Sequence, residues 1–191
     1  MSANYCIEEK RIYATGESNG GGFVDVLACS PEYGNRFAAF APVIGAFYSD
    51  VNDQSMCNLS RSRTPILEIH GYLDANFDCE HASILQTEPH WCQIPYNGTV
   101  GRDPPLKNPL PRILDWLARW ATRNGCAQGA MPDLEQREGY AFVKYDCGGI
   151  DRIVQHYRVD NWGHKWPNPE DGAVIDAGKI VMDFFSRHRL A

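Results

Sequence analysis

Several features that would place a protein in a large class are absent from this 191-residue sequence. It has no run of about 20 apolar residues, which argues against a transmembrane helix. Its first ten residues are polar and do not form a secretory leader. It also has no internal repeat and no low-complexity tract. What is left is a chain of ordinary globular composition, long enough to bury a core of its own.

Positive charge is also scarce. Lys and Arg number 18 against 24 Asp and Glu, which gives a formal net charge of −6. The basic residues are scattered along the chain and form no stripe. This balance disfavours nucleic acid or an anionic membrane as the main partner, and we expect neither.

Cysteine is plentiful, although no two cysteines form a C-x-x-C pair. The chain has seven widely spaced cysteines and two N-x-S/T sequons, at Asn58 and Asn97. This combination is typical of secreted, disulfide-bonded glycoproteins. We therefore expect a secreted, extracellular protein whose signal peptide is not part of this sequence. The alternative is a cytosolic protein with reduced thiols.

Apolar patterning indicates an α/β protein. It predicts strands at 11–15, 37–43, 64–70, 140–145 and 152–159, and helices at 19–29, 106–124 and 173–187. The middle helix carries an apolar stripe formed by Ile113, Leu114, Leu117 and Trp120. Because strands alternate with helices, we expect a mostly parallel sheet.

The segment from Gly16 to Gly20 reads G-E-S-N-G and lies between the first predicted strand and the first predicted helix. A serine between two glycines at a strand-to-helix turn is typical of the nucleophile elbow of α/β-hydrolases. The glycines leave room for a tight turn, and the strained backbone exposes the serine hydroxyl above the sheet. Ser18 is therefore the candidate nucleophile.

A serine hydroxyl needs a base, and the base needs an orienting carboxylate. Asp74 follows the strand at 64–70, and His164 follows the strand at 152–159. The order Ser18, Asp74, His164 is the order of α/β-hydrolases. Each residue comes just after the C-terminal end of a predicted strand, so all three should meet at one edge of a parallel sheet.

Other residues could take the roles of base or acid. A histidine at a strand end, within a strand or on a helix is more often structural, and an aspartate in a loop often caps a turn. The alternative bases are His70, His81, His90, His156 and His188, and the alternative carboxylates are Asp78, Asp160 and Asp171.

A series of motifs along nearly the whole chain resembles the secreted fungal feruloyl esterases, relatives of the polyhydroxybutyrate-depolymerase-like α/β-hydrolases. The resemblance implies a catalytic Ser18, Asp74 and His164. It also implies cleavage of ferulate and related hydroxycinnamates from the arabinose side chains of plant cell-wall xylan, without a metal or organic cofactor. The motifs are RIYATGESNGGGF at 11–23, FAAFAPV at 37–43, GAF at 45–47, IHGYLD at 69–74, IPYNG at 94–98, WLARW at 116–120, NGC at 124–126 and GHKWP at 163–167.

In such an enzyme the backbone N–H of Asn19 would donate to the oxyanion. An aromatic acyl group needs a flat apolar slot, and Tyr96, Trp162 and Trp166 lie near the predicted Asp and His loops. These three are candidates for substrate binding. The alternative is that they only pack against their own loops.

The chain departs from the family at its front. The strands that normally precede the nucleophile strand, and the loop that supplies a second oxyanion donor, are missing. We therefore expect residues 1–191 to form a single but partial, N-terminally truncated α/β-hydrolase domain. One alternative is a catalytically impaired remnant. Another is an esterase that acts on acetyl-xylan or polyhydroxyalkanoate.

A second departure is the segment Ala75–Gln93, a probable insertion. It contains Cys79, His81, His90 and Cys92, which fit a local disulfide, a zinc site or a retained non-coding stretch. Outside it, Cys29–Cys57 and Cys126–Cys147 are plausible disulfides. Cys6 is then left for a partner in the missing part.

Overall fold

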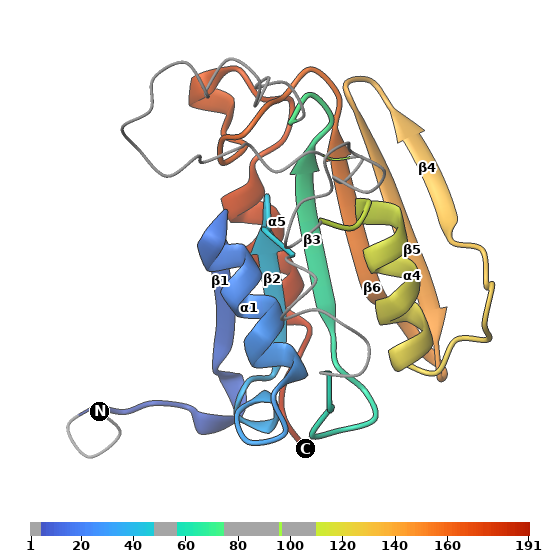
Figure 1. Ribbon diagram of the computed structural model, residues 1–191. Helices are drawn as coiled ribbons and strands as arrows, with labels where there is room; N and C mark the ends of the chain where they lie inside the picture. Colours follow the sequence, from blue (N-terminus) through green and yellow to red (C-terminus); the bar gives the residue numbers. More distant parts are fainter. Residues whose placement is uncertain (1–4, 48–56, 75–95, 97–109) are drawn as a thin grey trace, which may run out of the picture.

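The computed structural model describes residues 5–47, 57–74, 96 and 110–191, and its centre is a six-stranded mixed sheet (Figure 1). The strands lie in the order β1-β2-β3-β6-β5-β4. Their bounds are β1 (Tyr13–Glu17), β2 (Ala39–Val43), β3 (Ile66–Gly71), β4 (Asp133–Arg137), β5 (Tyr140–Cys147) and β6 (Ile150–Val159). The α-helices are α1 (Asn19–Cys29), α4 (Ile113–Arg123) and α5 (Ala177–Ser186), and the short 3₁₀ helices are η1 (Glu9–Arg11), η2 (Gly34–Arg36) and η4 (Pro169–Asp171).

Four strands, β1, β2, β3 and β6, are parallel to one another. Every residue of β2 and β3 is buried, because helices cover both faces of this part of the sheet. That explains why these strands are continuous apolar runs rather than alternating ones. The prediction of a parallel sheet is correct for these four strands.

The other two strands are antiparallel, so the sheet is mixed. β5 and β6 are joined by a tight turn at Gly148 and Gly149, both of which have positive φ, and β6 runs back along β5. β4, which the sequence patterns did not predict, pairs with β5 at the far edge and is exposed along its whole length. Its sequence, DLEQR, has no apolar run, so burial could not reveal it.

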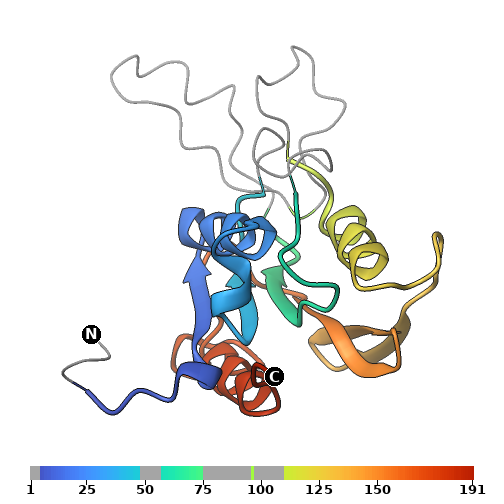
Figure 2. The same ribbon diagram turned by 90° about the horizontal axis from the view of Figure 1, so that it is seen from below.

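Helices lie on both faces of the sheet. Figure 2 shows α1 and α4 on one side and α5 on the other. The buried stripe of α4 is Ile113, Trp116, Leu117, Trp120 and Ala121, whereas Leu114 is 52% exposed. The predicted stripe is therefore wrong at Leu114, because Trp116 takes the inward position.

Two of the three helix predictions need correction at their first residues. The helix predicted at 106–124 begins at Ile113, since Leu110–Arg112 is not helical and includes Pro111. The helix predicted at 173–187 begins at Ala177, where the side chain of Asp176 accepts a hydrogen bond of 2.9 Å from the Lys179 N–H. That bond is a standard N-terminal cap. Helix α1, in contrast, has the predicted bounds.

Both predicted disulfides form, Cys29–Cys57 and Cys126–Cys147. The first joins the end of α1 to the segment before β3, and the second joins the loop after α4 to the end of β5. Cys6 is exposed and carries a free thiol. Within the described ranges, no helix is long and apolar enough to cross a membrane. The segment Ala75–Gln93 that the sequence predicts to be an insertion, with Cys79 and Cys92, lies outside the described residues.

Candidate active site

Ser18 lies between β1 and α1 with a φ of 56°, in the left-handed region where a residue with a side chain is strained. Its N–H donates to the carbonyl of Val43 over 3.1 Å, and its carbonyl accepts hydrogen bonds of 3.0 Å from Gly22 and Ala46. Its side chain does not cap the helix, although serine often does. Instead, the hydroxyl lies 3.0 Å from Nε2 of His164.

The glycines around Ser18 are not equally constrained. A Cβ on Gly16 would lie 2.6 Å from the backbone of Gly20, so this turn needs glycine at position 16. A Cβ on Gly20 would meet nothing within 4 Å. The prediction of a tight turn is therefore right at the first glycine and wrong at the second. The next two glycines are tightly packed as well: a Cβ on Gly21 would lie 2.8 Å from Cα of Gly45, and a Cβ on Gly22 would lie 2.2 Å from the carbonyl oxygen of Ala46.

Ser18, His164 and Asp74 form one hydrogen-bonded chain. Nδ1 of His164 lies 2.9 Å from Oδ2 of Asp74, which is fully buried. A neutral imidazole that donates from Nδ1 to the carboxylate leaves Nε2 to accept the serine proton, and this network assigns that tautomer. The three residues follow β1, β3 and β6, whose parallel directions bring their C-terminal ends to one edge.

The loop after β6 that carries His164, the histidine loop, is held by several contacts that the sequence patterns did not predict. The N–H of Leu73 donates to the carbonyl of Trp162 over 2.9 Å, and the N–H of Trp166 donates to the carboxylate of Glu17 over 3.0 Å. A Cβ on Gly71 would lie 2.3 Å from the Trp162 carbonyl oxygen. These contacts join segments far apart in the chain, so no local pattern could reveal them.

The backbone N–H of Asn19 is the first of helix α1 and makes no hydrogen bond within the described residues. The N–H groups of a helix's first turn are left without intrahelical partners, and the helix dipole makes that end favourable for negative charge. This N–H directly follows Ser18. It can therefore donate to an oxyanion that forms on a carbonyl bound to the serine.

Two buried polar residues, Glu68 and His70, lie next to Asp74. The ring of His70 lies between Oε1 of Glu68, 2.8 Å from Nδ1, and Oδ2 of Asp74, 3.1 Å from Nε2. Burial alone would raise the pKa of Asp74, but its contacts with His164 and His70 outweigh burial and hold that pKa below its usual value. Burial alone would lower the pKa of His70, but Glu68 and Asp74 raise it to about 9.

The three candidates for substrate binding all pack against the interior. Tyr96 is buried, and its hydroxyl lies 3.3 Å from Nε2 of His156. Trp162 and Trp166 are half-buried against the core cluster that includes α5, and the indole of Trp162 donates to the carbonyl of Lys165. These contacts explain the three positions by packing, and a role in binding an aromatic ring stays a prediction.

The alternative acids and bases have other partners where they are described. Asp160 accepts a hydrogen bond from Arg158, and Asp171 pairs with Lys165, both over 2.9 Å. Burial lowers the pKa of His188, at the opposite end of the sheet, to about 4. Asp78, His81 and His90 lie outside the described residues, as does the sequon at Asn97. Asn58, at the other sequon, is exposed.

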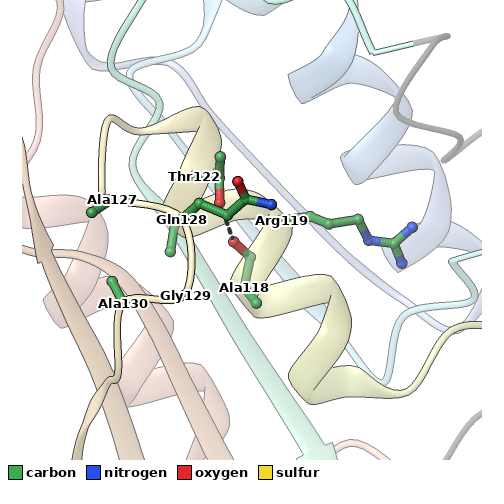
Figure 3. Close-up of a pocket in the computed structure, with 8 residues that line it drawn as sticks. Ala118, Arg119, Thr122, Ala127, Gln128, Gly129 and Ala130 are labelled. Atoms are coloured by element: carbon green, nitrogen blue, oxygen red, sulfur yellow. Dashed lines mark hydrogen bonds between the residues drawn. The ribbon is translucent and has the colours of Figure 1, made fainter.

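Among the hollows that the described residues line, the two largest lie away from the triad. One, of about 190 Å³, lies between the end of α4 and the turn at 127–130, and Arg119 extends away from the rest of its lining (Figure 3). The other, of about 860 Å³, lies where Pro65 leads into β3 and Ile150 begins β6. That is the sheet edge opposite Ser18. Within the described part of the chain, no group of three or more His, Cys, Asp or Glu residues could hold a metal ion.

Comparison with known proteins gives a distant relationship. No protein-family model matches the sequence. The chain is 24% identical over 203 residues to poly(3-hydroxyalkanoate) depolymerase C of Paucimonas lemoignei. The match covers 96% of this chain and 42% of the depolymerase, so the chain spans less than half the length of this relative. The partly parallel six-stranded sheet is consistent with an α/β-hydrolase-like fold.

Proposed function

We propose that this chain hydrolyses carboxylic esters through a covalent acyl-enzyme, with Ser18 as nucleophile, His164 as general base and acid, and Asp74 as the orienting carboxylate. The observation that carries the proposal is the continuous hydrogen-bond chain Ser18–His164–Asp74 at one sheet edge. The distant relationship to a depolymerase that is named for an ester polymer supports the same reaction class.

In the proposed mechanism, the Ser18 hydroxyl attacks the ester carbonyl while Nε2 of His164 takes its proton. The negative charge on the tetrahedral intermediate is stabilised by the Asn19 N–H at the start of α1. His164 then donates its proton to the leaving alcohol. Water, activated by the same imidazole, hydrolyses the acyl-serine. Asp74 stays ionised throughout and stabilises the imidazolium.

For the substrate we propose feruloyl and related hydroxycinnamoyl esters of arabinoxylan, which the motif resemblance implies. A second candidate is a hydroxyalkanoate ester, because the similar depolymerase carries that substrate in its name. The two disulfides support secretion into an oxidising compartment, where an enzyme acting on an insoluble polymer would meet its substrate.

The test compares the wild type, Ser18→Ala and a matched surface variant, Ser186→Ala, on methyl ferulate, an acetyl ester and a hydroxybutyryl ester. We expect Ser18→Ala to lose at least about 10³-fold in kcat, because the covalent step needs the hydroxyl. Ser186→Ala should retain the wild-type rate. Equal rates for the wild type and Ser18→Ala would refute the mechanism. The ratio of kcat/KM among the three esters assigns the substrate class.

A further inference from the structure

Asp74 has two histidine partners on a single oxygen. Nδ1 of His164 lies 2.9 Å from Oδ2, and Nε2 of His70 lies 3.1 Å from the same atom. His164 reaches the surface beside Ser18, whereas His70 is fully buried behind the carboxylate. The mechanism described above assigns no role to His70.

The position of the His70 ring defines its charge. Each of its nitrogens faces a carboxylate oxygen, Glu68 on one side and Asp74 on the other. A neutral imidazole has one N–H, so one of its nitrogens would turn a lone pair toward a carboxylate. Only an imidazolium donates to both. His164 differs because one of its nitrogens faces a hydroxyl, which the neutral ring can accept from.

The chain of buried polar contacts extends from Glu68 to two further residues, His156 and Tyr96. Oε2 of Glu68 lies 2.7 Å from Nδ1 of His156, its register partner on β6, although the ring N–H is not aligned well enough to count as a hydrogen bond. Nε2 of His156 in turn faces the Tyr96 hydroxyl. The other charged or titratable side chains around Tyr96 are Tyr72, Arg158 and Asp160, and the last two pair with each other.

We propose that His70 is a positioning residue for the orienting carboxylate, a buried imidazolium that fixes Oδ2 of Asp74 toward His164 and balances the charge of Glu68. This role rests on the proposed ester hydrolysis. Glu68, His70 and Asp74 then carry a net charge of −1 in the interior. Without the positive ring, two buried carboxylates would be left with a charge of −2, which a buried site strongly disfavours.

The charge state is tested on the wild-type protein, independently of any activity. We label the protein with ¹⁵N-histidine and record the two ring nitrogens of His70 against pH by NMR, with His70→Gln for assignment. We expect both nitrogens to carry protons at pH 7.5, with deprotonation near pH 9. A neutral His70 ring at pH 7.5 would overturn the proposal, even if the protein hydrolyses esters.

The positioning role is tested with His70→Gln and the double variant Glu68→Gln/His70→Gln. The control is His188→Gln, which replaces a half-buried histidine distant from the site. We expect His70→Gln to lower kcat roughly 10- to 100-fold with little change in KM. This is the size of effect seen for residues that orient the ligands of a catalytic metal. The double variant has the wild-type interior charge of −1, so it should recover most of the lost kcat. His188→Gln should hydrolyse esters at the wild-type rate.

The pH profile separates positioning from a purely structural effect. Contacts with His70 hold the pKa of Asp74 down, so removing them raises that pKa, and the acid-side loss of activity should begin at a higher pH in His70→Gln. An unchanged kcat and profile in a folded His70→Gln would refute the proposal, as would a double variant no better than the single one. If the wild type hydrolysed no ester, the proposed function would fail, while the NMR titration would still decide the charge of His70.

Discussion

At the residue scale, the hydroxyl of Ser18 faces His164 because the backbone on each side is held. Val43, Gly22 and Ala46 bind the Ser18 peptide groups, and the positive φ of Ser18 is maintained by these three hydrogen bonds. The strain is thus opposed by contacts with the chain after β2 as well as with α1. The turn at Ser18 is set by tertiary contacts and not by the two flanking glycines alone.

The two flanking glycines should respond oppositely to alanine. Gly16→Ala forces a Cβ against the Gly20 backbone, so we expect loss of most ester hydrolysis and lower stability. Gly20→Ala meets open space in the first turn of α1, and alanine favours a helix over glycine by up to about 1 kcal/mol. It should keep the wild-type kcat and unfold at equal or higher denaturant concentration. A Gly20→Ala variant as inactive as Gly16→Ala would contradict this difference.

At the element scale, β3 and β6 carry most of the site, and part of it could be read from the sequence. The positions of Ser18, Asp74 and His164, each just after the end of a predicted strand, were enough to predict their meeting, because parallel strands end at one edge. The buried polar residues behind them had a weaker signal in the sequence. Glu68 and His70 are polar residues two apart in an apolar strand, so they share a face. Their pairing with β6 needed the register, which no local pattern gives.

The antiparallel half of the sheet was harder to predict for a different reason. The turn at Gly148-Gly149 marks a hairpin, yet alternation of helices and strands elsewhere favoured a parallel sheet. β4 has no apolar residue facing a core, and only its pairing with β5 defines it. Likewise, the contact of Glu17 with the histidine loop depends on the approach of distant segments.

Helix α1 offers a stability test through Asp25, which is buried against α4. Its Oδ1 accepts a hydrogen bond of 2.7 Å from the Trp120 indole, but burial outweighs this and raises the pKa of Asp25 to about 6. A raised carboxyl pKa means that ionisation destabilises the fold as the pH rises through about 6. Asp25→Asn should therefore stabilise the protein at pH 8 by roughly 2–3 kcal/mol and change little at pH 4.

Denaturant unfolding at pH 4, 6 and 8 measures this effect. Asp133→Asn, in the exposed strand β4, serves as the control and should leave the unfolding free energy within about 0.5 kcal/mol at each pH. A pH-independent effect of Asp25→Asn would mean that burial does not raise the pKa of Asp25.

At the scale of the whole molecule, two disulfides and a doubly covered sheet hold a site that contains several buried charges. Burial would raise the pKa of Glu68, but His70 and His156 outweigh it and lower that pKa. The lowered carboxyl pKa values of Glu68 and Asp74 stabilise the fold above about pH 4.5, and this stability is lost in acid. The raised pKa of His70 stabilises the fold below pH 6.5 and its contribution is lost as the pH approaches 9.

We therefore expect the free energy of unfolding to be greatest near pH 5–6 and to fall by roughly 2–3 kcal/mol between pH 6.5 and 9.5. Asp25 ionises at lower pH, so the destabilisation from its raised pKa develops between about pH 4 and 6 and is complete above that range. Asp25→Asn removes this contribution, and the His70 contribution is then read alone. The measurement is guanidinium unfolding followed by tryptophan fluorescence at half-unit pH steps. A flat profile in Asp25→Asn from pH 6.5 to 9.5 would contradict a charged, buried His70.

The most direct test of the proposed mechanism is covalent labelling of Ser18, the proposed nucleophile. The protein is treated with diisopropyl fluorophosphate, which phosphorylates serines activated by a neighbouring base, and the product is mapped by peptide mass spectrometry. We expect one adduct on Ser18 in the wild type, and labelling slowed by at least about 10³-fold in His164→Ala. A wild type that stays unlabelled, or that is labelled equally fast without His164, would contradict the claim that this imidazole activates Ser18.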